Sequence, residues 1–287
     1  MTTAQEVLIE AGPTAVRPTR RNRIPVSLWV SGGVLLVLIL LGVLAPVIAP
    51  YSPLQIDPLA RLQGPSAQHL LGTDPDGRDV LSRLLYGETS ALTGVAIAVG
   101  VAAVVGTVWG ILASAAGTVV DTVLMGLTDV VLSFPGIVLA VAVTGVLGPS
   151  LDHAMISVGI VFAPMIARIM RNAVLPVRRA AYVTAARSVG TPLWRVTLRH
   201  ILPNSMAPVI VQLCSLASMT LLVQAALGFL GLGAQPPAPS WGADLALAYS
   251  YFTSAPLATI APGLAVVIGA LSLSAVGDSI RKTLDID

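Results

Sequence analysis

Long apolar runs separated by short polar segments dominate the hydrophobic pattern of this chain. Six runs stand out, and they cover residues 27–49, 91–117, 122–147, 151–167, 206–232 and 255–277. A helix that crosses a bilayer needs about 20 mostly apolar residues, and its backbone groups must be satisfied within the segment. The pattern therefore predicts an all-α membrane protein with six transmembrane helices.

Composition supports the membrane prediction. Hydrophobic residues make up 55% of the 287 residues and charged residues only 10%, where soluble domains carry about 25%. The net charge of +2 gives no reason to expect a nucleic-acid partner. Cys214 is the single cysteine, so we expect a small core residue, no intrachain disulfide and no metal site.

The distribution of basic residues predicts the orientation in the membrane. Four arginines precede the first run, seven lie between Arg168 and Arg199, and two basic residues follow the last run, which puts 13 of 16 on one face. By the positive-inside rule this face is cytoplasmic, and both termini lie there. The expected division is a cytoplasmic tail over 1–26, a first helix over 27–49, an extracytoplasmic segment over 50–88, a core with five helices over 89–280, and a cytoplasmic tail over 281–287. The first run is too long for a signal peptide, so we expect it to stay uncleaved.

A basic loop over 182–204, YVTAARSVGTPLWRVTLRHILPN, separates the fourth and fifth runs. Residues 179–188 are good helix formers, and Gly190 follows where a helix would end. Four apolar residues of the loop remain available for a partner groove or for the underside of the bundle, namely Tyr182, Val189, Leu193 and Trp194. Local physics leaves two readings open, docking of another protein or attraction to anionic lipid headgroups.

A second short helix is expected after this glycine. Thr191 offers an N-cap and Pro192 suits the first helical position. The helix should run to about His200, and Pro203 with Asn204 should end it before the fifth span.

Residues outside the loop also carry expectations. Spacing of Gly106 with Gly110, and of Ala113 with Gly117, predicts close helix packing. Pro135 should kink or break the third span. Asp129 should face the bundle interior or a subunit interface, because a carboxylate facing lipid is costly, and we expect no ionisable neighbour at its depth. Three aromatic residues are expected to form an interfacial belt, namely Trp241, Tyr249 and Tyr251.

The external segment contains HLLGTDPDGRD at 69–79. Gly72, Gly77 and Asp74 suit tight turns, and Arg78 could pair with Asp74, Asp76 or Asp79 in an exposed loop. A functional role for this turn remains the alternative to a structural one.

Four stretches in register resemble one family. They are the basic loop, with Ala185-Ala186, Gly190 and Leu202-Pro203, then 69–79, DVVLSFPG at 129–136, and ALGFLGLGAQPPAPSWG at 226–242. Together they resemble the C-subunit type of dipeptide/oligopeptide/nickel permeases of ABC importers, from residue 27 to the end. The acidic residue that names the loop motif is replaced by Thr184, and Gln224 and Gly228 replace the glutamate and serine that are usual in the family.

The resemblance implies the type I ABC importer permease arrangement, with the basic loop as the coupling helix region. The residues it assigns to coupling are Tyr182, Thr184, Ala185, Ala186, Arg187, Gly190, Trp194 and Arg195. External candidates are Asp74, Gly77, Arg78, Asp79 and Trp241, which would receive an extracytoplasmic binding protein, and Asp129 is the candidate for the translocation path.

The function implied is ATP-driven import of short peptides across a bacterial inner membrane. The partners implied are a second homologous permease, two ATPase subunits that hold ATP and Mg²⁺, and a substrate-binding protein. A P-loop needs a lysine after a glycine-rich turn, and Lys282 is the single lysine of the chain, so we expect no ATPase site and no cofactor here. Relatives that import nickel chelates or haem-like ligands leave the cargo open.

Two rival functions fit less well. An ion-gradient-driven transporter would need paired intramembrane carboxylates or broken helices in both halves, and Asp129 alone qualifies. An intramembrane hydrolase would need a convergent catalytic group, but the three histidines are scattered along the chain and no HExxH is present.

Overall fold

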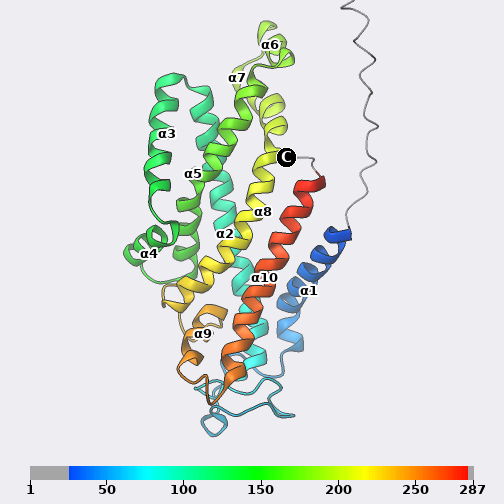
Figure 1. Ribbon diagram of the computed structural model, residues 1–287, viewed down its shortest axis with the longest axis vertical. Helices are drawn as coiled ribbons and strands as arrows, with labels where there is room; N and C mark the ends of the chain where they lie inside the picture. The colour runs from blue at the N-terminus through cyan, green and yellow to red at the C-terminus, as the bar shows by residue number, and fades with distance from the viewer. Residues whose placement is uncertain (1–25, 284–287) are drawn as a thin grey trace, which may run out of the picture.

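The computed structural model describes residues 26–283, and within that range its regular elements are helices, with one isolated bridge between Thr73 and Asp79 (Figure 1). The expected cytoplasmic tail with its four arginines, and the last four residues, lie outside the described residues. The long helices are α1 (Val26–Ile48), α2 (Val80–Ala115), α3 (Thr118–Ser133), α4 (Gly136–Leu147), α5 (Leu151–Arg178), α8 (Leu202–Phe229) and α10 (Pro256–Thr283). Shorter elements are η1 (Pro58–Ala60), α6 (Ala181–Ser188), α7 (Leu193–Val196), the π-helical turn η2 (Thr197–Ile201) and α9 (Trp241–Tyr249).

The described residues contain five helices long and apolar enough to cross a membrane, or six if α3 and α4 count as one span. This agrees with the predicted fold class. The third run is not one straight helix, however, because α3 and α4 meet at 93°. Pro135 lies at the break, where a missing N–H and a fixed φ disfavour continuation, and the predicted effect of this proline is confirmed.

Helix α2 begins well before its apolar run. It begins at Val80, not near Ala91, because Asp79 is an N-cap whose Oδ2 accepts a hydrogen bond from the backbone N–H of Ser82 at 2.8 Å. Charged residues occupy the added turns, which is why the apolar pattern missed them. Helix α5 likewise continues past its apolar run to Arg178.

The centre of the molecule is the contact between α2 and α5. A Cβ added to Gly106 would lie 2.6 Å from the carbonyl oxygen of Ala163, and one added to Gly110 would lie 2.5 Å from that of Ala167. On the other helix, a Cβ on Gly159 would lie 2.7 Å from the carbonyl oxygen of Ala98. The backbones therefore touch directly, which confirms the predicted role of Gly106 and Gly110.

Gly117 has a different role, in the connection between α2 and α3. It precedes α3 with φ +97° and has no neighbour within 4 Å of an added Cβ, so its predicted part in helix packing was wrong. A positive φ at the tight connection between α2 and α3 explains the glycine instead.

The remaining helices surround this centre. Buried side chains of α5 and α8, among them Met155, Ile166, Met170 and Leu216, form one core cluster with small residues of α2. Helices α1 and α10 lie together on one side of the bundle (Figure 1). Figure 1 also places α6 and α7 at one end and α9 with the segment before α2 at the opposite end.

The glycine contact can be tested by adding one methyl group. We expect Gly106→Ala to destabilise the protein by about 1–3 kcal/mol, because the new Cβ overpacks against α5. Gly100→Ala is the matched control on the same helix, where a Cβ would meet nothing within 4 Å. Thermal unfolding in detergent should separate the two, and equal melting temperatures would contradict a backbone-to-backbone contact.

Candidate functional site

The basic loop forms a helix that is closed by a glycine. Helix α6 ends at Ser188, and Gly190 follows with φ +79°. The Gly190 N–H donates to the Arg187 carbonyl at 2.9 Å, and the Thr191 N–H donates to the Ala186 carbonyl at 3.2 Å. These two bonds define a Schellman ending, so the predicted role of Gly190 at a helix C-terminus is confirmed.

The second helix of the loop differs from the expectation. Pro192, not Thr191, is the capping residue of α7, which starts at Leu193. The predicted end at Pro203 and Asn204 was wrong, because the helical run continues from Leu193 to Phe229. The π-helical turn η2 lets the Leu202 N–H donate to Thr197 and places Pro203 in the first turn of α8, where a missing N–H costs little.

Two valines hold the loop against the bundle while its larger apolar side chains stay exposed. Val183 and Val196 are fully buried in the core cluster. Four side chains remain 48–81% exposed, namely Tyr182, Val189, Leu193 and Trp194. Arg195 lies 5.3 Å from the Trp194 ring, within range for a cation–π contact. These side chains form an exposed apolar patch, a feature typical of protein or membrane interaction sites.

The other coupling candidates are on α6. Thr184, Ala185 and Arg187 are exposed, and Ala186 packs partly against the core cluster. The Thr184 hydroxyl donates back to the Ala180 carbonyl at 3.4 Å, so its hydrogen bond is made one turn earlier in the chain. The structure therefore gathers all eight predicted coupling residues on one loop at one end of the molecule.

At the opposite end, Asp74 organises the turn before α2. Its Oδ1 accepts from the backbone N–H of Asp76 at 2.8 Å and of Arg78 at 2.9 Å, and its Oδ2 accepts from Arg78 Nε at 2.7 Å. Arg78 also reaches Asp76 with Nη2 at 2.6 Å. The predicted pairs with Asp74 and Asp76 are present, but the expectation of an exposed loop was wrong, because Arg78 is only 5% exposed.

Gly77 and Asp79 complete this turn. Gly77 has φ +82°, and an added Cβ would lie 1.9 Å from the carbonyl oxygen of Asp57. Asp79 uses one carboxylate oxygen to cap α2 and the other to contact His69 Nδ1 at 3.0 Å. The turn is thus fixed both to the preceding segment and to the start of α2.

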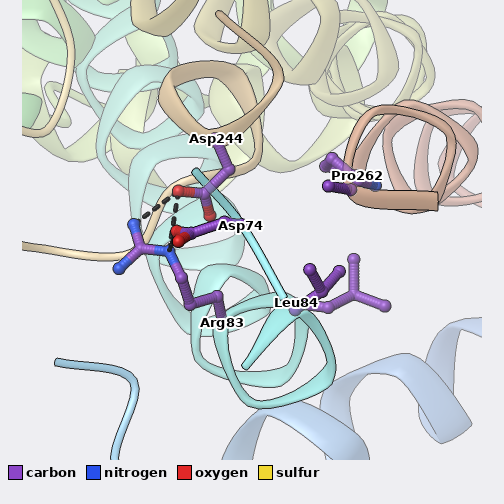
Figure 2. A pocket seen from close by; sticks show the side chains of 7 residues that line it. Asp74, Arg83, Leu84, Asp244 and Pro262 are labelled. Carbon is purple, nitrogen blue, oxygen red and sulfur yellow. Dashed lines mark hydrogen bonds and ion pairs between the residues drawn. The ribbon is translucent and has the colours of Figure 1, made fainter. Parts of the chain in front are cut away.

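Arg83 is the residue that sequence reasoning missed. Its Nε donates to Asp244 Oδ1 at 2.9 Å, and its Nη1 donates to the carbonyl oxygens of Pro53 at 3.0 Å and Pro237 at 3.3 Å. Figure 2 shows Arg83 between Asp74 and Asp244 in a small pocket that Leu84 and Pro262 also line. Burial raises the pKa of the Asp244 carboxyl, and Arg83 opposes this shift. One arginine therefore joins three segments far apart in the sequence, a fact that no local motif signals.

Trp241 was placed wrongly by the sequence. It is 4% exposed, and its Nε1 donates to the Leu84 carbonyl at 2.9 Å, so it belongs to the core and not to an interfacial belt. It fits because Gly87 leaves room for the indole ring. Tyr249 and Tyr251 are exposed.

Asp129 has a partner that was not expected. Arg168 of α5 donates to it. About two helical turns nearer the start of α3, Asp121 pairs with Arg171 of α5. The prediction that no ionisable group lies near Asp129 was wrong. The carboxylate is 68% exposed on the isolated chain, close in sequence to the break between α3 and α4.

Gln224 and the capacity to bind a metal ion are the two remaining features of the described residues. Gln224, where the family usually has glutamate, donates from Nε2 to the Ser90 carbonyl at 2.9 Å, while its Oε1 has no partner. Within residues 26–283, no group of three or more His, Cys, Asp or Glu side chains could hold a metal ion.

Comparison with known sequences covers nearly the whole chain. The family described as binding-protein-dependent transport system inner membrane component matches residues 106–285, and the N-terminal transmembrane domain of oligopeptide transport permease C matches residues 15–65. The dipeptide transport system permease protein DppC of Alkalihalophilus pseudofirmus is 40% identical, over 86% of this chain and 81% of its own length. A probable D,D-dipeptide transport system permease protein of Escherichia coli is 36% identical, over 97% of both chains.

A solved structure shares the fold. It comes from inward-facing conformations of the MetNI methionine ABC transporter, with a TM-score of 0.58 and 20% identity. The match covers 70% of this chain and 96% of that chain. The helical arrangement is therefore that of an ABC importer permease.

The external turn gives a second prediction. We expect Gly77→Ala to destabilise the assembled protein by more than about 2 kcal/mol, because the new Cβ would overlap the Asp57 backbone at a φ that L-residues disfavour. Gly64→Ala is the matched control in the same segment, where nothing lies within 4 Å. Yield of folded protein and its melting temperature are the measurements, and tolerance of Gly77→Ala would show that the turn is mobile.

Proposed function

The chain belongs to the family of binding-protein-dependent transport system inner membrane components, and we propose that it is a membrane-spanning subunit of an ATP-driven importer for short peptides. In this proposal it pairs with a second, homologous permease and is driven by two ATPase subunits. A substrate-binding protein delivers the cargo from the external side.

The observation that carries the proposal is the geometry of the basic loop. Its buried valines hold it rigidly to the core, and its exposed apolar side chains and arginines face away from the rest of the chain. A loop built in this way can accept force from a partner, because the helical run from Leu193 to Phe229 connects it directly to the bundle. Attraction to anionic lipid headgroups would explain the arginines of the loop but not its exposed apolar side chains.

ATP and Mg²⁺ belong to the partner subunits in this proposal. Lys282 is the single lysine of the sequence and follows Arg281 without a glycine-rich turn, so the chain lacks the sequence of a P-loop. The loop residues Tyr182, Arg187, Trp194 and Arg195 would contact the ATPase.

The cargo assignment rests on the relatives. The dipeptide permease at 40% identity and the probable D,D-dipeptide permease at 36% identity favour peptides over nickel chelates and haem-like ligands. On the external side, a cavity of about 370 Å³ is bordered by Asp76, Arg78, Phe229 and Ala243, and the binding protein would dock over this region.

Asp129 and Arg168 are proposed to border the translocation path. Exposed charges on a membrane helix are costly against lipid, so they face water or protein. A broken helix is likewise tolerated at membrane depth only where it faces water or protein. The 93° break between α3 and α4 follows Asp129 closely in sequence. Both features favour a surface that faces the second permease or an aqueous path between the two subunits.

Coupling can be tested at Gly190. We expect Gly190→Val to abolish most peptide uptake while ATP hydrolysis by the assembled complex continues, because a β-branched residue at φ +79° distorts the loop at a cost of about 1–2 kcal/mol. Gly190→Asn is the control, since asparagine tolerates this conformation at a helix end.

Both activities would be measured on the whole complex in proteoliposomes with its binding protein. Normal uptake in the Gly190→Val complex would contradict the coupling role of the loop.

Orientation gives a further prediction. In a Cys214→Ser background, an impermeant thiol reagent added to intact cells should label cysteines at Asp76 and Ala238, and leave those at Arg179 and Lys282 unlabelled. All four positions are partly or fully exposed in the structure, so access depends on the side of the membrane. Labelling of the Arg179→Cys variant from outside would overturn the topology.

A further inference from the structure

A cavity of about 270 Å³ lies between α1, α2 and α10. Its walls are almost entirely apolar, and they include Leu38, Leu41, Leu84, Leu85, Leu264 and Ile268. Leu264 and Ile268 are also 53% and 45% exposed, so the cavity opens onto the outer apolar surface of the bundle.

One acidic residue, Glu88, lines this apolar cavity. It is 5% exposed, and no hydrogen-bond or ion-pair partner is found for it among the described residues. Its stem is held between helices, because an added Cβ on Gly42 of α1 would lie 2.7 Å from Glu88 Cγ. The adjacent Thr89 hydroxyl donates to the Gly42 carbonyl at 3.0 Å and fixes the same contact. Burial of an acid without a partner is costly, so the carboxyl needs an explanation.

The position of Glu88 along α2 indicates its depth in the bilayer. Helix α1 ends at Ile48, and the backbone N–H of Tyr51 donates to the Ser82 hydroxyl at 3.1 Å, so Ser82 lies where the chain leaves the membrane. Glu88 is about 9 Å further along α2, at 1.5 Å per residue. The interfacial layer on each side of the hydrocarbon is about 5–8 Å thick. Glu88 therefore lies near the level at which phospholipid ester groups meet the acyl chains.

We infer that this cavity binds a phospholipid of the outer leaflet, with an acyl chain between α1, α2 and α10 and an ester carbonyl at Glu88. An unpaired carboxyl in an apolar cavity is far less costly when it is neutral. A neutral carboxyl carries one O–H donor, and the ester oxygen accepts it. A partner helix is about 10 Å across and does not fit the space. The inference depends on the membrane location of the chain and not on its cargo.

Trp241 provides a built-in reporter, because its buried ring also lines the cavity. The other tryptophans, Trp29, Trp109 and Trp194, are changed to phenylalanine, and the whole complex is placed in phosphatidylethanolamine and phosphatidylglycerol vesicles. One acyl chain carries bromine, which quenches tryptophan on contact, either near the ester or near the methyl end. We expect loss of most Trp241 fluorescence with bromine near the ester end, although the indole is shielded from bulk lipid.

Four variants decide what occupies the site. Ala265→Phe fills the cavity and should abolish quenching, while Leu271→Phe, on the outer face of the same helix, should leave it unchanged. Glu88→Gln retains a donor and should keep the preference for the ester end, whereas Glu88→Leu should lose it. ATP hydrolysis and size-exclusion profiles report assembly, and Glu88→Leu decides alone if Ala265→Phe fails to assemble.

Other outcomes would overturn the inference. Absence of quenching would mean that no acyl chain enters. Quenching that is equal in the parent, Ala265→Phe and Glu88→Leu would mean that bromine reaches Trp241 by another route. Quenching that an added cargo peptide relieves would assign the cavity to cargo.

Discussion

Direct backbone contact between α2 and α5 is the constraint on which the rest of the structure depends. Inside a membrane there is no hydrophobic force between helices, so packing of small residues must hold them together. Gly106, Gly110 and Gly159 bring the two backbones into contact, and the buried side chains of α8 pack on the resulting ridge. At the break at Pro135, α4 turns by 93° from α3, and both helices contact α5.

The two ends of the molecule are attached to this centre in different ways. The basic loop is attached by apolar burial, through Val183 and Val196, and then continues as one helical run into α8. The external end is attached by ion pairs and caps, with Asp74, Asp79 and Arg83 at its centre. Helix α8 connects the loop at one end to the region of α9 at the other.

Buried ionisable side chains in this chain fall into two kinds, those with polar partners in the structure and one without. Arg83 and Asp244 satisfy one another and two backbone carbonyls, which makes their burial affordable in a fold with few charges. Glu88 is equally buried but has no such partner among the described residues. The contrast points outside the chain for its explanation, towards the lipid that surrounds it.

Much of the fold followed from the sequence alone, because apolar length and glycine or proline chemistry act locally. The six runs, the break at Pro135 and the helix ending at Gly190 were all predictable for this reason. The continuation of the loop helix through Pro203 was not, since a π-helical turn removes the conflict that the proline normally creates. Trp241, Arg83 and the partner of Asp129 were also beyond prediction, because each is defined by a contact with a residue far away in the chain. Tertiary structure decided which polar groups met, and the sequence decided which segments could cross the membrane.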